Sequence, residues 1–151
     1  HSREVLEVEL ARLAAVRATA EDKAAMLAAI EQMRESTAAE AVVSANTAFH
    51  LAVADAAGNT VLRAMMQAMT QLLNELVRHA PDDHPTIALK IKGHVAVYEA
   101  IVANDPEAAG EAMRDHVRSF ELVHCDGIEP AALVESSSLR LSSLDRHRAA
   151  S

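Results

Sequence analysis

The stretch NDPEAAGEAMRDHVRSFELV at residues 104–123 decides the fold class, because it joins a complete helix start to one uninterrupted helical pattern. Asp105 can cap the first turn, and Pro106 suits the first helical position because no partner is needed there for a backbone N–H. Glu107 is favourable beside the positive end of the helix dipole. Apolar residues then recur every three or four positions. The stretch therefore predicts an amphipathic α-helix with one buried face.

Working outward from this helix, turn-forming residues separate five further helical patterns. They predict helices over about residues 3–18, from Thr19 to about residue 35, over 38–57, from a cap at Asn59 or Thr60 onward, and over 86–103. Gly58 ends the third helix, and the prolines and aspartates of residues 80–85 predict a turn. Residues 124–151 are expected to form a partly disordered tail with a short docked helix around 130–134. The fold class is all-α.

Apolar stripes predict the faces that these helices bury. The fourth helix has the longest stripe, and its methionines are the simplest candidates for filling a core or a dimer interface. The predicted stripes are Leu6, Leu10, Leu13 and Ala14 in the first helix; Met26, Ile30 and Met33 in the second; Leu62, Met65, Met66, Met69, Leu72, Leu73 and Leu76 in the fourth; and Ile87, Ile91, Val95, Tyr98 and Ile101 in the fifth.

The composition supports one helical domain and excludes several classes of function. The chain has 151 residues, of which half are hydrophobic and only 2% aromatic, which does not suit a β-sandwich. Its net charge of −8 argues against direct binding to nucleic acid or to an anionic membrane. Cys125 is the only cysteine, so an intrachain disulfide is excluded. Nothing therefore suggests an oxidising compartment, and we expect a cytoplasmic protein. No apolar run approaches the roughly 20 residues of a membrane span.

Three of the eight histidines fall on apolar helix faces, namely His50, His94 and His116. Asn46 precedes His50 by four residues and projects from the same face. Burying such a group without a partner costs about 1–3 kcal/mol, so four of them require a common explanation. Three imidazole nitrogens and one amide oxygen suit Zn²⁺ or another divalent first-row metal. The alternative is that the backbone or water satisfies each group separately.

Other polar residues suggest an anion site near these histidines. Arg3 precedes the apolar stripe of the first helix by one turn, where its guanidinium could bind a carboxylate or extend to solvent. Gly93 either weakens its helix or admits a close neighbour, and Asp115 points away from His116 as a surface charge. The fourth helix carries a polar stripe typical of a solvated face, in which Asn74 is the preferred candidate to line a cavity: Arg63, Gln67, Thr70, Asn74 and Arg78.

Several motifs in one order resemble the ligand-binding FCD domain of FadR-type GntR transcription regulators over about residues 3–122. They are REVLE at 3–7, LAA at 13–15, NTAFH at 46–50, AAGN at 56–59, His94 with EAI at 99–101, NDPEAA at 104–109 and MRDH at 113–116. The resemblance implies an antiparallel bundle of six to seven helices over residues 1–123. It also implies a small carboxylate or sugar acid as effector, reached by Arg3.

The family's metal site has an Asp and three His, and His50, His94 and His116 match the histidines. Asn46 stands where the family usually has Asp. An amide brings no charge, so we expect weaker metal binding but a stronger preference for an anionic effector. Zn is the expected metal, with Ni or Mn as alternatives.

The family's N-terminal winged helix, which binds DNA, has no counterpart in these residues, so DNA contact is expected only through that missing domain. The expected function is effector sensing by a homodimer rather than catalysis. One alternative is a metal-dependent hydrolase, for which no inward carboxylate is predicted to serve as general base. Another is a metal-free helical interaction module.

Overall fold

The computed structural model describes residues 2–77 and 84–125, which form six α-helices and no β-strand. The helices are α1 (Ser2–Arg17), α2 (Ala20–Glu35), α3 (Ala39–Ala56), α4 (Thr60–Val77), α5 (His84–Val102) and α6 (Pro106–Cys125). The predicted all-α class is confirmed, with all six helices near their expected positions. The short helix predicted at 130–134 and Arg78 lie outside the described residues. No helix in the described ranges has the length and apolarity needed to cross a membrane.

Local capping explains most of the helix boundaries. Thr19 forms a capping box with Asp22, in which each side chain accepts a hydrogen bond from the other residue's backbone amide. Gly58 adopts a left-handed φ of 62° after α3. The side chain of Asn59 accepts the amides of residues 61 and 62, which identifies it as the cap of α4. Asp105 caps α6 as predicted, by accepting the amide of residue 108.

Two boundaries differ from the sequence prediction. Helix α5 begins at His84, so Pro85 belongs to its first turn rather than to the preceding turn. This position suits proline, because the first amides of a helix need no intrahelical acceptor. Helix α6 continues past Val123 to Cys125. The predicted turn therefore ends earlier, and the last helix ends later, than the sequence pattern indicated.

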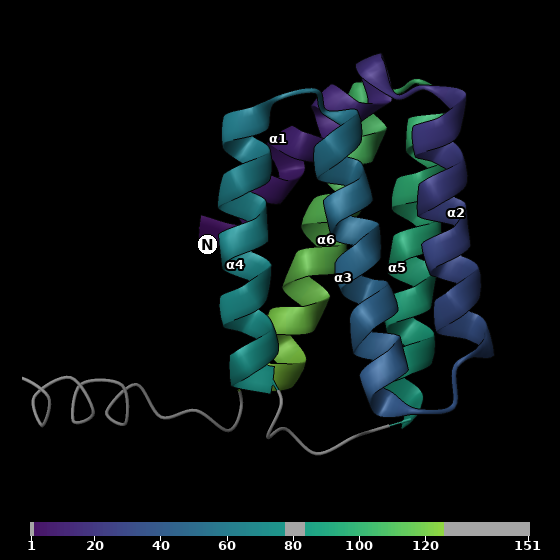
Figure 1. The fold of residues 1–151 in the computed structure, drawn as a ribbon, viewed down its shortest axis with the longest axis vertical. Coiled ribbons are helices and arrows are strands. Elements are labelled where there is room, and N and C mark those ends of the chain that lie inside the picture. The colour runs from purple at the N-terminus through teal and green to yellow at the C-terminus, as the bar shows by residue number, and fades with distance from the viewer. Residues whose placement is uncertain (1, 78–83, 126–151) are drawn as a thin grey trace, which may run out of the picture. The chain divides into compact units, whose positions relative to one another are not determined.

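The chain divides into two compact units, residues 1–120 and 121–151, and the bundle described below is the first. In this unit α3 lies between α2 and α4 (Figure 1), and α1 packs against α3, α4 and α5. Helix α6 contributes Met113 and Val117 to the shared core. Ion pairs tie it to α1, where Glu4 contacts Arg118 and Arg12 contacts Glu107, each at 2.9 Å. The predicted stripe of α2 is fully buried.

Helix α4 buries only part of its predicted apolar stripe, since Leu62 and Met69 pack against the core beside Met66. Met66 is buried, but Val61, Met65 and Leu72 are 67%, 53% and 62% exposed. On its polar stripe, Thr70 is buried and donates to the carbonyl of Met66. The prediction that this polar stripe is a solvated face is therefore wrong at Thr70, while part of the apolar stripe faces solvent. The apolar stripe therefore predicts the inward face but not its exact limits.

Candidate metal centre

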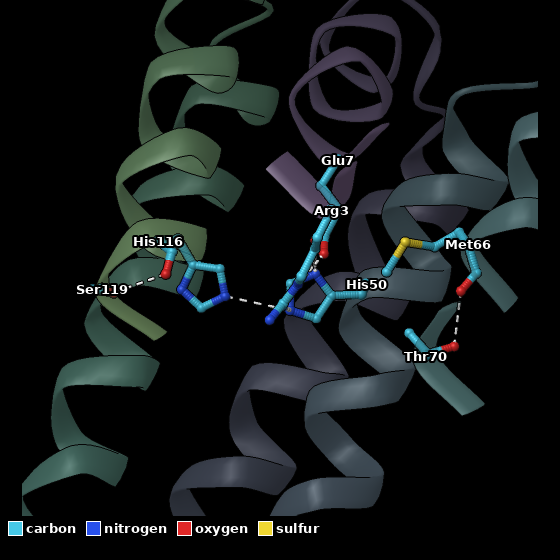
Figure 2. Close-up of polar contacts among 7 residues, drawn as sticks. All are labelled: Arg3, Glu7, His50, Met66, Thr70, His116 and Ser119. Carbon is cyan, nitrogen blue, oxygen red and sulfur yellow. Dashed lines mark hydrogen bonds and ion pairs between the residues drawn. The ribbon is translucent and has the colours of Figure 1, made fainter. Parts of the chain in front are cut away.

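Three helices bring the three predicted histidines together. His50 comes from α3, His94 from α5 and His116 from α6, and all three are buried. One ring nitrogen from each lies within 4.8 Å of the other two. The Nε2 atoms of His50 and His116 are 3.3 Å apart (Figure 2), and the ring centroids of His94 and His116 are 4.2 Å apart. Three imidazoles from separate parts of the sequence thus form one cluster.

The spacing and chemistry of these nitrogens fit a divalent metal ion. Zn–N bonds of 2.0–2.1 Å in a tetrahedral site place neighbouring ligand nitrogens about 3.3 Å apart. The distance between the Nε2 atoms of His50 and His116 matches this value. Imidazole is a good ligand for Zn²⁺, Ni²⁺ and related ions. The cluster can therefore supply three ligands and leave further coordination positions to other groups.

Two neighbouring residues shape the cluster from α3 and α5. Phe49 is fully buried and presents its ring edge-on to His50 and His94, with centroids 5.7 and 4.7 Å away. At Gly93, an added Cβ atom would lie only 2.5 Å from Nδ1 of His116. The structure therefore resolves the two interpretations of Gly93, because its lack of a side chain gives His116 room to pack against α5.

Glu7 on α1 is the main residue of this site that the sequence prediction missed. Its carboxylate is 1% exposed, and its two oxygens contact Nδ1 of His50 and Nε of Arg3, each at 2.5 Å. Figure 2 shows the Arg3 and Glu7 side chains reaching His50 from α1. The expectation that no carboxylate points inward with the histidines is therefore wrong. A signal was available, since Glu7 lies one helical turn after Arg3, which was itself placed on the inward stripe.

Electrostatics keep the Glu7 carboxyl ionised. Burial alone would raise its pKa, but the close contacts with His50 and then Arg3 outweigh burial and lower the pKa to about 2. The Arg3 side chain is itself only 10% exposed. One of its terminal nitrogens lies 3.5 Å from Nε2 of His50. A buried carboxylate and a nearly buried guanidinium thus border the histidine cluster.

The remaining predicted site residues lie in different settings. Asn46 is half-buried on α3, one turn before His50. Asn74 on α4 is half-buried and exchanges hydrogen bonds with the Thr47 hydroxyl, at 2.9 and 3.3 Å. This contact links α3 to α4 and occupies both ends of the Asn74 amide. Asp115 is exposed, as predicted.

Known proteins place the chain in a family. The FCD domain family matches residues 1–119. The Glc operon transcriptional activator of Escherichia coli K12 is 34% identical over 133 residues, covering 79% of this chain and 51% of the activator. The HTH-type transcriptional regulator LutR of Bacillus subtilis is 30% identical over 125 residues, covering 79% and 57%. The transcriptional repressor NanR of Cronobacter sakazakii is 30% identical, covering 75% and 45%. The chain spans about half the length of these relatives.

Solved structures show the same fold. Streptococcus agalactiae GntR superposes with a TM-score of 0.70 at 20% identity, covering 81% of this chain and 56% of that one. Escherichia coli McbR/YncC superposes with a TM-score of 0.71 at 18% identity, covering 81% and 60%. Together with the family match across residues 1–119, this likeness establishes both the relationship and the helical architecture. The chain belongs to the FCD domain family of GntR-type regulators.

Proposed function

We propose that this chain is the effector-sensing domain of a bacterial-type transcription regulator, and that it binds a small carboxylate or sugar acid at a divalent metal ion. The observation that carries the proposal is the cluster of His50, His94 and His116, because three buried imidazoles from three helices bring one ring nitrogen each within 4.8 Å of the other two, a convergence that suits a divalent metal ion. The similarity to a transcriptional activator and a transcriptional repressor supports the regulatory role.

The three histidines would hold the metal, with the amide oxygen of Asn46 as a fourth candidate ligand. Zn²⁺ is the first choice for three nitrogens and one oxygen, and Ni²⁺ or Mn²⁺ are alternatives. A bound ion would supply positive charge and Lewis acidity to an anionic ligand. No ligand in this set carries a negative charge, so a carboxylate effector would be attracted strongly.

Arg3 would add a second positive group for the effector. Its guanidinium is nearly buried and lies beside His50. A guanidinium can bind a carboxylate through two parallel hydrogen bonds. Asn74 remains a weaker candidate for effector contact, because both ends of its amide already engage Thr47.

Sensing is favoured over catalysis by the state of the buried carboxylate beside the histidines. A metal-dependent hydrolase would need a general base, and Glu7 is the buried carboxylate beside the histidines. Both of its oxygens are engaged, one by Arg3 and one by His50. A carboxylate held ionised in this way is a poor proton acceptor.

The wider organisation is also part of the proposal. Residues 1–123 would form the effector domain and residues 124–151 a tail, while DNA binding would come from a winged-helix domain N-terminal to these residues. The coverage of about half of each relative supports a further domain. We expect a cytoplasmic homodimer, and the exposed apolar residues of α4 give a second copy a surface on which to pack.

Metal analysis tests this function directly. Protein purified without nickel resin should contain close to one divalent ion per chain, and His94→Ala should lose it. The control is Glu111→Ala, which changes an exposed residue of α6 and should keep the ion. A metal content near zero in the unaltered protein, or one unchanged by His94→Ala, would overturn the metal site.

A ligand screen separates the sensor from an enzyme. Short carboxylates and sugar acids are added to the metal-loaded protein while its melting temperature is followed. A sensor predicts that at least one acid raises the melting temperature and is recovered chemically intact. Turnover of that acid would contradict the sensor assignment.

A further inference from the structure

We propose that Glu7 is a positioning residue that holds the His50 imidazole with its proton on Nδ1, so that Nε2 is the atom that binds metal. The inference rests on the metal site proposed above and assigns a role to a residue outside the predicted ligand set. It explains why a carboxylate is buried beside three imidazoles.

The first observation is the contact between Glu7 and Nδ1 of His50. The distance is 2.5 Å, and both side chains are 1% exposed. An ionised carboxylate oxygen and a bare nitrogen lone pair would repel each other at this distance, so the contact is favourable only where Nδ1 carries a proton. Without water access to either group, this contact fixes the ring orientation. Nε2 then faces His116, whose own Nε2 is 3.3 Å away.

The second observation comes from Arg3 and is independent of the first. A terminal guanidinium nitrogen of Arg3 lies 3.5 Å from Nε2 of His50, at the outer limit of a hydrogen bond. A guanidinium has only donors, so this approach is favourable only where Nε2 carries a lone pair. The neighbours on both nitrogens of His50 therefore require the same tautomer, and it is the one that exposes a metal-binding lone pair.

Glu7 and Arg3 should consequently affect metal binding in opposite directions. Ligating histidines commonly donate their second ring N–H to a carboxylate, which orients the ring and increases its basicity. Arg3, in contrast, places positive charge next to the atom that must bind a cation. Arg3 also neutralises part of the charge of Glu7 through its 2.5 Å contact. A purely structural role for the pair would make the loss of either residue equally harmful.

The test measures Zn²⁺ affinity by competition with a chelator in the 151-residue chain and three variants. Glu7→Gln should weaken binding by about 10–100-fold, the range usual for removal of an outer-shell carboxylate. Arg3→Gln should bind Zn²⁺ at least as tightly as the unaltered chain. Glu9→Gln is the matched control, because Glu9 lies exposed on the same helix and should leave affinity unchanged.

Nitrogen-15 NMR of histidine-labelled, metal-free protein provides a second readout that does not require the variants to fold. The His50 signals should report a proton on Nδ1 and none on Nε2. The opposite tautomer would overturn the role of Glu7, as would equal losses of affinity in Glu7→Gln and Arg3→Gln or a change below threefold in Glu7→Gln. If the unaltered chain binds no Zn²⁺, the proposed metal function fails, while the NMR result still decides the tautomer.

Discussion

The first two turns of α1 and the outer face of α4 depart in opposite ways from the usual distribution of residues. Helix α1 buries two charged side chains, Arg3 and Glu7. Helix α4 exposes two large apolar ones, Met65 and Leu72. Both regions belong to regular helices of similar length, so secondary structure does not explain the difference.

The difference lies in what each region contacts within the described bundle. The buried charges have partners, because Glu7 contacts both Arg3 and His50. Ionised groups tolerate burial only when they are paired in this way. The exposed side chains Met65 and Leu72 lie seven positions apart, and so on one face of α4, and an exposed apolar patch is typical of a surface that packs against another molecule. The start of α1 is thus organised around an internal ligand site. We propose that the outer face of α4 packs against a second copy of the chain.

The largest expected effect is on stability: truncating the charged Glu7 should destabilise the fold more than truncating the large apolar Leu72. Glu7→Ala should lower the free energy of unfolding by about 3 kcal/mol, because it removes the buried carboxylate that contacts both Arg3 and His50. Leu72→Ala should cost about 0.5 kcal/mol or less in the monomer, because the side chain is exposed. Urea denaturation of both metal-free variants measures the two values. Equal losses would show that the contrast between α1 and α4 has no energetic basis.

A second test is how the two losses of stability depend on protein concentration. The loss at Glu7 arises within one chain and should not depend on concentration. If a second copy covers α4, the loss at Leu72 should grow as concentration rises, because dimerisation contributes to stability. A Leu72→Ala effect that is independent of concentration would contradict a dimer interface on this face.

A smaller effect is expected where α5 supports the cluster. Gly93→Ala places a methyl group where His116 now packs, so Zn²⁺ affinity should fall by at least about tenfold. The control is Gly110→Ala, where an added Cβ would meet the side chain of Arg12, which is flexible and partly exposed. Chelator competition should show normal affinity in the control. Normal affinity in Gly93→Ala would mean that the cluster adapts without loss.

The smallest effect concerns the residue that departs from the family pattern. Asn46→Asp adds a negative charge one turn before His50, and we expect Zn²⁺ to bind more tightly by a factor on the order of ten. Isothermal titration of metal-free protein measures the change. Equal or weaker affinity would show that the charge argument at this position is wrong.

The sequence predicted those features that depend on neighbouring residues. Helix starts at Thr19 and Asp105 follow from capping groups within three positions, so the pattern identified them correctly. The three histidines could be selected because a polar residue on an apolar stripe is conspicuous.

The features that were missed depend on contacts between distant segments. The local sequence places Glu7 one turn after Arg3, but its burial depends on contact with His50, which lies 43 positions later. The orientation of α4 likewise depends on its packing against α3, where Asn74 bonds to Thr47. Local periodicity gave the two faces of α4 but carried no information about either contact.

The close approach at Gly93 has a consequence for how this site can change during evolution. In a helix interior, alanine is more favourable than glycine by about 1 kcal/mol, so glycine should persist at position 93 only where something else requires it. Here the requirement is the ring of His116. We therefore expect the two positions to vary together among related sequences, with side chains returning at position 93 wherever the histidine at position 116 has been lost.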